Sequence, residues 1–228
     1  MRALAEEWGR TLVVAPHPDD EVLGAGGTIA RLAAEGAPAT VAIVTSGRPP
    51  RFDADQVARV REEACAAHAH LGVGETLWLD QPAAELAEVA HADLNAAIEH
   101  AMREAAPETL LVPFVGDIHR DHQLVFLAAM VAARPNRAGY PARVLAYETL
   151  SETNWNAPYL TPGFQPNVFV DIASTLERKL EAMRLFSSQL REPPDERSIE
   201  ALAALATLRG AGMRLAAAEA FVHVRAVI

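Results

Sequence analysis

Short apolar runs alternate with longer amphipathic stretches along most of this chain. The short runs are rich in aliphatic and β-branched residues and end at Gly, Pro or polar residues, which is typical of buried strands. They predict strands over Leu12–Pro16, Thr40–Thr45, Glu75–Leu79, Thr109–Phe114 and Arg143–Tyr147. Apolar residues recur at helical spacing between these runs, and this spacing predicts helices over 26–35, 53–71, 91–105 and 119–134.

The repeated strand–helix order predicts a Rossmann-like α/β fold with a mostly parallel sheet flanked by helices. We expect residues 1–150 to form this core. Residues 148–170 resemble a loop, because they contain several prolines, and helical patterns return at 174–190 and 198–215. The prediction is therefore one domain over residues 1–228, in which 151–228 add a substrate loop and C-terminal helices.

Charge and hydropathy exclude several classes of partner. The net charge is −10 and no Lys/Arg cluster is present, which argues against nucleic acid and against an anionic membrane surface. No apolar run approaches the ~20 residues of a membrane span, and residues 1–10 lack the apolar region of a signal peptide. We therefore expect a cytoplasmic protein; a homo-oligomer is compatible with these data. The lone Cys65 is expected to be a small core residue.

The first predicted strand ends in a cluster of ionisable residues. His17, Asp19, Asp20 and Glu21 follow directly on Leu12–Pro16. In an open α/β sheet, the carboxyl ends of the strands are where ligands bind. One imidazole and two carboxylates at that position can hold a metal ion and leave one carboxylate free as a base.

A second acidic and imidazole cluster follows the fourth predicted strand. It contains Asp117, His119, Asp121 and His122. On a helix, His119 and His122 would share one face, because they are three residues apart. In the usual nucleotide-binding strand order the fourth strand lies beside the first, so the two clusters should meet across the crevice at the carboxyl edge of the sheet.

Together these clusters resemble the signature motifs of the PIG-L/LmbE-like deacetylases. The first motif is the segment 15–21 with the glycine-rich segment 24–28, and the second is the His-x-Asp-His element at 119–122. The resemblance extends to the helix around Arg59, Arg61, Glu62 and Glu63 and to C-terminal segments between 166 and 221, so it covers nearly the whole chain.

The resemblance implies a metal centre. Members of this family bind a divalent metal, usually taken as zinc, through residues that match His17, Asp20 and His122. Two imidazoles and one carboxylate leave a coordination position open for water, as catalytic zinc sites require. The expected cofactor is Zn²⁺ or another divalent ion such as Fe²⁺.

The resemblance also implies a reaction and its catalytic residues. Asp19 would be the general base, His119 would stabilise the oxyanion or protonate the leaving amine, and Asp121 would orient an imidazole. The implied reaction removes the N-acetyl group from an N-acetylglucosamine-type amino sugar or its conjugate and releases acetate and a free amine. Glu21 has no assigned role, since a structural residue fits the sequence equally well.

Substrate contacts are less closely specified. Mycothiol-pathway relatives carry a tyrosine where this chain has Asp117, so a thiol-conjugate substrate is in doubt, and Asp117 is expected to cap a helix or support the site. Arg59, Arg61 and Trp155 are further candidates, and Tyr159 and Phe164 could stack on a sugar. The loops 45–55, 80–88 and 148–166 should form the substrate walls, and their polar character favours a small hydroxyl-rich ligand.

Two other functions fit parts of the pattern. His17 and Asp19 with a distant His122 also match the facial triad of a non-haem iron oxygenase, although such sites usually lie on all-β folds. A non-catalytic sugar-binding relative is a second alternative, but it would be expected to lose Asp19. The glycines at 24–27 lie too far past the strand for a dinucleotide-binding turn, so we attribute them to close packing.

Overall fold

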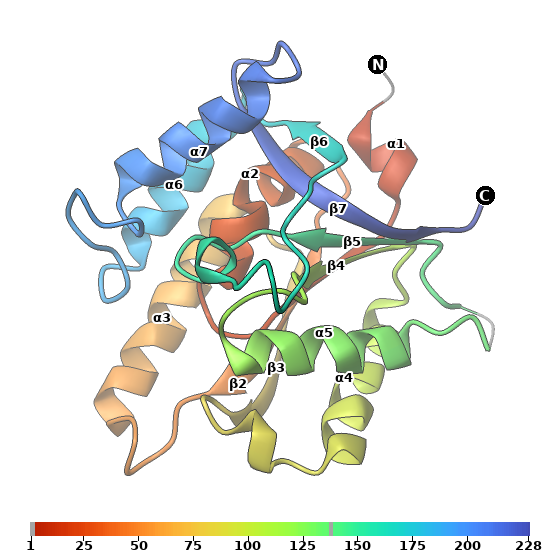
Figure 1. Ribbon diagram of the computed structural model, residues 1–228, viewed down its shortest axis with the longest axis vertical. Coiled ribbons are helices and arrows are strands. Elements are labelled where there is room, and N and C mark those ends of the chain that lie inside the picture. The colour runs from red at the N-terminus through yellow and green to blue at the C-terminus, as the bar shows by residue number, and fades with distance from the viewer. Residues whose placement is uncertain (1–2, 137–138) are drawn as a thin grey trace.

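A single seven-stranded sheet organises the computed structural model, which describes residues 3–136 and 139–228 (Figure 1). The strand order is β3-β2-β1-β4-β5-β7-β6. The strands are β1 Thr11–Ala15, β2 Thr40–Ser46, β3 Glu75–Pro82, β4 Thr109–Pro113, β5 Arg143–Tyr147, β6 Val168–Asp171 and β7 Ala218–Ala226. The helices are α1 Leu4–Trp8, α2 Asp20–Ala34, α3 Ala54–Leu71, α4 His91–Ala105, α5 Arg120–Ala132, α6 Leu176–Leu185 and α7 Ile199–Ala211.

The first five strands pair in parallel, whereas the pairings that involve β7 are antiparallel. β1 lies between β2 and β4, and Leu12 is opposite Thr40 on one side and Leu110 on the other. β7 runs antiparallel to both β5 and β6. The carboxyl ends of β1 and β4 are therefore neighbours at one edge of the sheet, as the sequence predicts.

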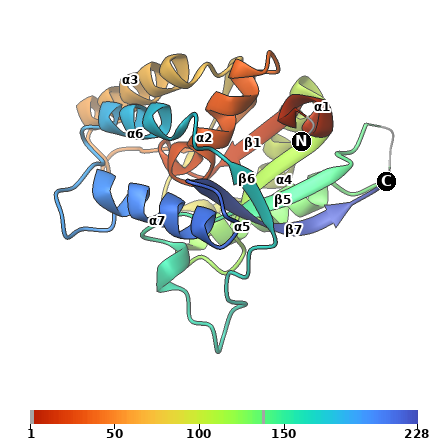
Figure 2. The same cartoon turned by 90° about the horizontal axis from the view of Figure 1, so that it is seen from above.

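Alternating side chains of the parallel strands enter two separate cores. Val13 and Ala15 of β1 pack with α2, α3, α6 and α7 on one face of the sheet. Leu12 and Val14 pack with α4 and α5 on the other face. Figures 1 and 2 show these two groups of helices on opposite sides of the sheet. Burial on both faces explains why the parallel strands are continuous apolar runs in the sequence.

The five predicted strands and the helix over 91–105 are confirmed, but the prediction is wrong in two places. The first helix begins at Asp20 rather than near Gly26, because its glycines lie inside the helix. A Cβ atom on Gly24 would come within 2.2 Å of Tyr147 Cδ2, so the glycine allows α2 to pack against β5. The second difference is in the C-terminal part, where β6 and β7 extend the sheet and the prediction has only loops and helices.

Helix α3 corrects the expectation for Cys65. The helix buries Ala64, Ala67, His68 and Leu71, which follow helical spacing. Cys65 lies off this stripe and is exposed. Among the residues that the structure describes, no helix is long and apolar enough to cross a membrane.

A buried ion pair connects the C-terminal part to α2. Lys179 Nζ lies 2.6 Å from Glu219 Oε1 and donates to the carbonyl oxygen of Leu23 at 2.8 Å. Glu219 also accepts hydrogen bonds from the backbone amides of Gly27 and Thr28 at 2.9 and 2.7 Å. Both members of the pair thus make further hydrogen bonds to α2, and the pair fixes α6 and β7 against the helix that carries Asp20.

Replacing one partner of this pair should destabilise the fold strongly. Lys179→Met leaves the Glu219 carboxylate buried without its cation, and such losses cost about 3–5 kcal/mol. The matched control is Arg184→Met on the same helix, since the Arg184–Glu177 pair is exposed and worth at most about 1 kcal/mol. Urea unfolding followed by circular dichroism measures both. An equal decrease in the free energy of unfolding for the two variants would contradict this account.

Candidate active site

The turn between β1 and α2 places the first cluster of ionisable residues. Its conformation is unusual, because Asp19 has a φ of 116°, a region that residues with side chains rarely occupy. Two carboxylates hold the backbone there: Asp20 Oδ2 accepts from the amide of His17 at 2.8 Å, and Glu21 Oε2 accepts from the amide of Asp19 at 3.2 Å. The turn is therefore stabilised by the same acidic residues that the motif contains.

Glu21 continues this support into the core. Its Oε1 lies 3.1 Å from His68 Nε2, and His68 Nδ1 lies 2.8 Å from the hydroxyl of Thr76. Glu21 and His68 are both buried. The chain of contacts ties the turn that carries Asp19 to α3 and β3, which gives Glu21 the structural role that the sequence left open.

The second cluster surrounds the start of α5. Of the two roles expected for Asp117, a helix cap or support of the site, the cap is wrong, because His119 is the capping residue and its Nδ1 accepts from the amide of Asp121 at 3.1 Å. Asp117 is buried before the helix instead, where it accepts from His122 Nδ1 at 2.8 Å and from the hydroxyl of Thr153 at 2.6 Å. Asp117 therefore orients the ring of His122.

The two clusters meet at the carboxyl edge of the sheet. His122 Nε2 lies 3.2 Å from Asp20 Oδ2, which joins α5 to α2. His17 lies between the clusters, with Nδ1 3.2 Å from Asp20 Oδ2 and Nε2 3.1 Å from Asp121 Oδ2. The ring centroids of His17 and His119 are 4.6 Å apart. These contacts follow from the β1–β4 pairing.

The arrangement of His17, Asp20 and His122 fits a metal ion. Each residue offers a ligand atom, and these atoms all lie within 4.8 Å of one another. Among the described residues, Asp20 Oδ1 is buried without a hydrogen-bond partner, and buried His122 Nε2 makes no hydrogen bond and has only the ion-pair contact to Asp20 Oδ2. Because Asp117 engages Nδ1 of His122, the Nε2 atom is the one left for a metal, as is usual for histidine ligands. This cluster could therefore bind a divalent ion.

A second group, His17, His119 and Asp121, meets the same distance criterion. Its atoms are already engaged in the protein, however. His119 Nδ1 accepts from the amide of Asp121, and Asp121 Oδ2 accepts from the amide of Ala84 at 2.7 Å. We therefore favour His17, Asp20 and His122, because Asp20 Oδ1 and His122 Nε2 make no hydrogen bond within the described part of the chain.

The electrostatics also favour a cation. Burial alone would lower the pKa of His17, but hydrogen bonds to Asp121 and Asp20 outweigh it and raise this pKa to about 9. The pKa of His122 is raised to about 10 despite burial, because Asp20 and Asp117 lie beside it. Burial opposes ionisation of Asp20, yet the two imidazoles lower the pKa of its carboxyl well below the usual range. The carboxylates thus stabilise positive charge at this point.

For the two candidate catalytic residues, Asp19 and His119, burial shifts the pKa toward the uncharged form. Burial raises the pKa of Asp19 to about 7, although the charge of Arg197 opposes this shift. Burial, together with the charges of His17 and His122, lowers the pKa of His119 to about 4. His119 is therefore neutral at pH 7. Its Nδ1 accepts a backbone hydrogen bond, so the proton of the neutral ring is on Nε2.

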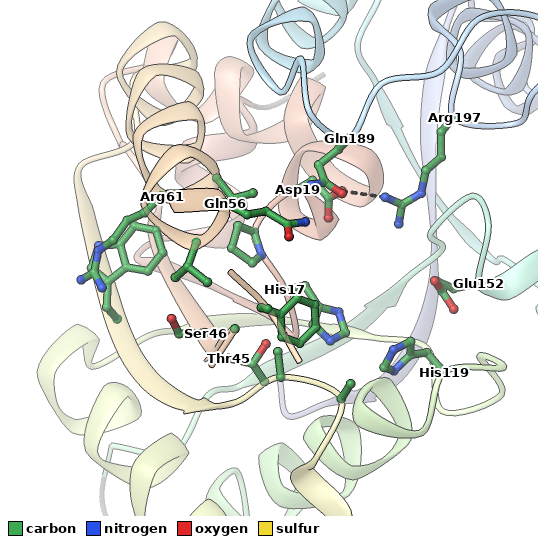
Figure 3. Close-up of a pocket in the computed structure, with 18 residues that line it drawn as sticks. His17, Asp19, Thr45, Ser46, Gln56, Arg61, His119, Glu152, Gln189 and Arg197 are labelled. Carbon is green, nitrogen blue, oxygen red and sulfur yellow. Dashed lines mark hydrogen bonds and ion pairs between the residues drawn. The ribbon is translucent and has the colours of Figure 1, made fainter. Parts of the chain in front are cut away.

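Arg197 is a part of the site that the sequence does not predict. Its Nη1 lies 2.9 Å from Asp19 Oδ2 (Figure 3). Its Nε donates to the hydroxyl of Ser151 at 2.8 Å. Arg197 comes from the segment between α6 and α7, far from Asp19 in sequence. No local pattern marks this arginine, because only the tertiary fold brings it to the turn after β1.

A cavity of about 270 Å³ opens beside the cluster (Figure 3). The three predicted loops contribute to its wall through residues such as Ser46, Ala84 and Glu152. Arg61 also lines the cavity, whereas Arg59, Asp117 and Trp155 do not. Asp117 lies against His122 of the candidate metal-binding group and is fully buried.

The aromatic residues of the cavity also differ from the predicted ones. Trp155 and Tyr159 are 64% and 85% exposed, and Trp155 Nε1 donates to Glu196 at 2.7 Å. The ring of Phe164 packs against Phe114 at a centroid distance of 5.1 Å. The aromatic side chains that line the cavity are Phe52 and Trp78, which come from the β2–α3 loop and β3.

Comparison with known proteins identifies the family of this chain. The family model PIG-L, described as GlcNAc-PI de-N-acetylase, matches residues 12–133, which is more than half of the chain and includes both clusters. This chain belongs to the PIG-L family. It is 31% identical to a 1D-myo-inositol 2-acetamido-2-deoxy-alpha-D-glucopyranoside deacetylase from Mycobacteroides abscessus, with 83% of this chain and 85% of the relative covered.

Solved structures show how widely this PIG-L fold is used. The N,N'-diacetylchitobiose deacetylase from Pyrococcus horikoshii has a TM-score of 0.76 at 22% identity, with 98% of this chain and 87% of that chain covered. The 4-carboxy-2-hydroxymuconate hydratase GalB from Pseudomonas putida also has a TM-score of 0.76, at 23% identity, with 96% and 98% covered. Since a hydratase shares the fold, the reaction of this chain has to be argued from its site.

Metal analysis tests the ligand set directly. The protein as purified should hold about one divalent ion per chain, because three protein ligands are typical of a catalytic zinc site. His122→Ala should remove most of it and weaken Zn²⁺ binding in calorimetry. The control is His119→Ala, a neighbouring imidazole that should leave metal content unchanged. Full metal content in His122→Ala with loss in His119→Ala would favour the alternative group His17, His119 and Asp121.

Proposed function

We propose that this PIG-L family chain hydrolyses the acetyl amide of an N-acetylglucosamine-type amino sugar or conjugate and releases acetate and a free amine. The observation that carries this proposal is one cluster with three kinds of group. It has candidate metal ligands with unpartnered buried atoms, the carboxylate of Asp19, and the neutral imidazole of His119. The family match and the deacetylase named from Mycobacteroides abscessus support the same reaction.

His17, Asp20 and His122 would hold the metal, which is Zn²⁺ or another divalent ion such as Fe²⁺. When bound, such an ion lowers the pKa of a water molecule and polarises a carbonyl oxygen. Two residues outside the ligand set orient these imidazoles. Asp117 holds His122 through Nδ1, and Asp121 holds His17 through Nε2, so both rings have fixed directions.

Asp19 would act as the general base. It lines the cavity beside Asp20, and its carboxylate, which belongs to neither candidate ligand group, would take a proton from water. Arg197 holds the carboxylate in place at 2.9 Å, and Glu21 holds its backbone. Adjacent residues of one turn would therefore have different roles: Asp20 faces the imidazoles as a metal ligand, and Asp19 faces the cavity as the base.

His119 would supply a proton donor on the cavity wall. Its Nε2 carries the proton when the ring is neutral, because Nδ1 accepts from the helix backbone. A fixed N–H donor stabilises the oxyanion of a tetrahedral intermediate or passes its proton to the leaving amine. No serine or cysteine nucleophile is required, and Cys65 lies on the exposed side of α3.

The alternatives fit these observations less well. A non-haem iron oxygenase usually has an all-β fold, whereas this chain has a mixed α/β fold and belongs to the PIG-L family. A non-catalytic sugar-binding relative would not need Asp19 held by both Arg197 and Glu21. The hydratase with the same fold adds water to a substrate, and such a reaction would release neither acetate nor an amine.

The reaction is tested by product release from N-acetylated sugars. The metal-loaded protein should release acetate and a free amine in equal amounts from an N-acetylglucosamine compound, and in ¹⁸O-water one label should enter each acetate. A chelator should abolish turnover, and Zn²⁺ or another divalent ion should restore it. A covalent acyl-protein seen by mass spectrometry, or chelator-resistant turnover, would rule out this mechanism.

Variants of the two adjacent aspartates separate base from ligand. Asp19→Asn is nearly isosteric and should keep the metal, but it should lower kcat by about 10²–10⁴-fold, the usual contribution of a general base. Asp20→Asn is the matched control one residue away, and it should weaken metal binding. If Asp19→Asn lost the metal while Asp20→Asn kept it, the two roles would be reversed.

A further inference from the structure

The cavity beside the metal cluster has two chemically different ends. The end at the cluster is polar and includes Asp19, His119, Glu152 and Arg197, which Figure 3 shows converging from several elements. At the other end, on the side where Figure 3 places Arg61, the wall is made by the β2–α3 loop, α3 and β3. The apolar side chains there are Phe52, Val57, Val60 and Trp78.

This apolar end is closely packed rather than a gap between loops. A Cβ atom on Gly47 would lie 2.8 Å from Phe52 Cγ and 2.9 Å from Val57 Cγ2, so both side chains are seated directly against the backbone of Gly47. Phe52, Val57 and Trp78 are half-buried. They are therefore fixed by the fold while part of their apolar surface faces the cavity.

The positive charge at this end is already paired. The guanidinium of Arg61 lies 4.2 Å from the ring centroid of Trp78, and its Nη1 is 3.2 Å from Asp80 Oδ1. Arg61 therefore extends the wall as a stacked plane, and its charge is balanced by Asp80 before any ligand arrives. This changes the role that the sequence suggests for Arg61, namely a contact to hydroxyls or to an anionic group.

The chemistry of this wall selects the kind of group that it can bind. Ser46 and Gln56 also line the cavity. The side chains of Phe52, Val57 and Val60 offer no hydrogen bond, however, so a sugar hydroxyl placed directly against them would lose its contact with water unfavourably. An alkyl or aryl group would gain from leaving water. The wall is continuous with the cavity at the metal cluster, so such a group would belong to the same molecule as the reacting amide.

We propose that the pocket end formed by Phe52, Val57, Val60 and Trp78 is a subsite for an apolar group carried by the amino-sugar substrate. This inference rests on the proposed deacetylase function and specifies its substrate class. The apolar group is either the aglycone of the sugar or an acyl chain longer than acetyl, and both present the same chemistry to this wall. The substrate would thus have a polar sugar and an apolar group, whereas the polar character of the loops in the sequence favours a ligand that is only rich in hydroxyls.

Two series of substrates test the subsite and identify the source of the apolar group. One series keeps the N-acetyl group and lengthens the aglycone from the methyl to the butyl and hexyl glycoside of N-acetylglucosamine. The other keeps free glucosamine and lengthens the acyl chain from acetyl to butanoyl and hexanoyl. In one series kcat/KM should rise by about fourfold for each methylene that enters the subsite. No rise in either series would overturn the proposal.

A variant of the wall provides the control for general hydrophobicity. Val60→Ser should reduce the ratio of kcat/KM for the hexyl member to that for the shortest member by about fourfold or more. Leu208→Ser removes an exposed leucine of α7 that does not line the cavity, and it should leave this ratio unchanged. A ratio that both variants lower equally would contradict a subsite at Val60.

Binding without turnover separates this inference from the proposed function. Hexyl glucoside and methyl glucoside lack an amide, so their affinities by calorimetry do not depend on deacetylation. Wild-type protein should bind the hexyl compound at least about tenfold more tightly, and Val60→Ser should reduce this difference. Tight hexyl binding without hydrolysis of any N-acyl sugar would support the subsite and contradict the proposed function. Hydrolysis of N-acyl sugars, with equal affinities for the two glucosides and no change of kcat/KM with chain length, would support the proposed function and contradict the subsite.

Discussion

The parallel pairing of β1 with β4 is the contact on which the candidate site depends. It places the turn after β1 and the start of α5 at one edge of the sheet, although they are about a hundred residues apart. β1 then passes into α2 within four residues, and Asp19 adopts a positive φ inside that connection. Such backbone strain costs about 1–3 kcal/mol and persists only when neighbouring contacts hold it, as Glu21 does here.

The second constraint is electrostatic. Asp20, Asp117 and Asp121 lie within hydrogen-bonding distance of the imidazoles of His17 and His122, and little water reaches them. Carboxylates at such depth require compensating positive charge. A divalent ion at the unpartnered atoms of Asp20 and His122 would supply that charge, and Arg197 compensates Asp19 separately. The negative charge of these buried aspartates would thus be compensated by the metal ion at Asp20 and by Arg197 at Asp19.

Local pattern and tertiary contact explain which features the sequence predicts. The parallel strands are predicted because they are buried on both faces, and the two clusters because each lies directly after such a strand. β7 is not predicted because Ala218 and Ala220 at its start have low β propensity, and the four residues of β6 are too few to show a pattern. Arg197, His68 and Trp78 reach the site only through the fold, so no spacing in the sequence marks them.

The central claim is that one metal ion joins the two strand ends through His17, Asp20 and His122. X-ray absorption at the zinc edge tests it most directly. The zinc-loaded protein should show two imidazole nitrogens and oxygen ligands at about 2.0–2.2 Å and no sulfur, and His122→Ala should show one imidazole fewer. A spectrum without imidazole scattering, or one unchanged in His122→Ala, would contradict the account.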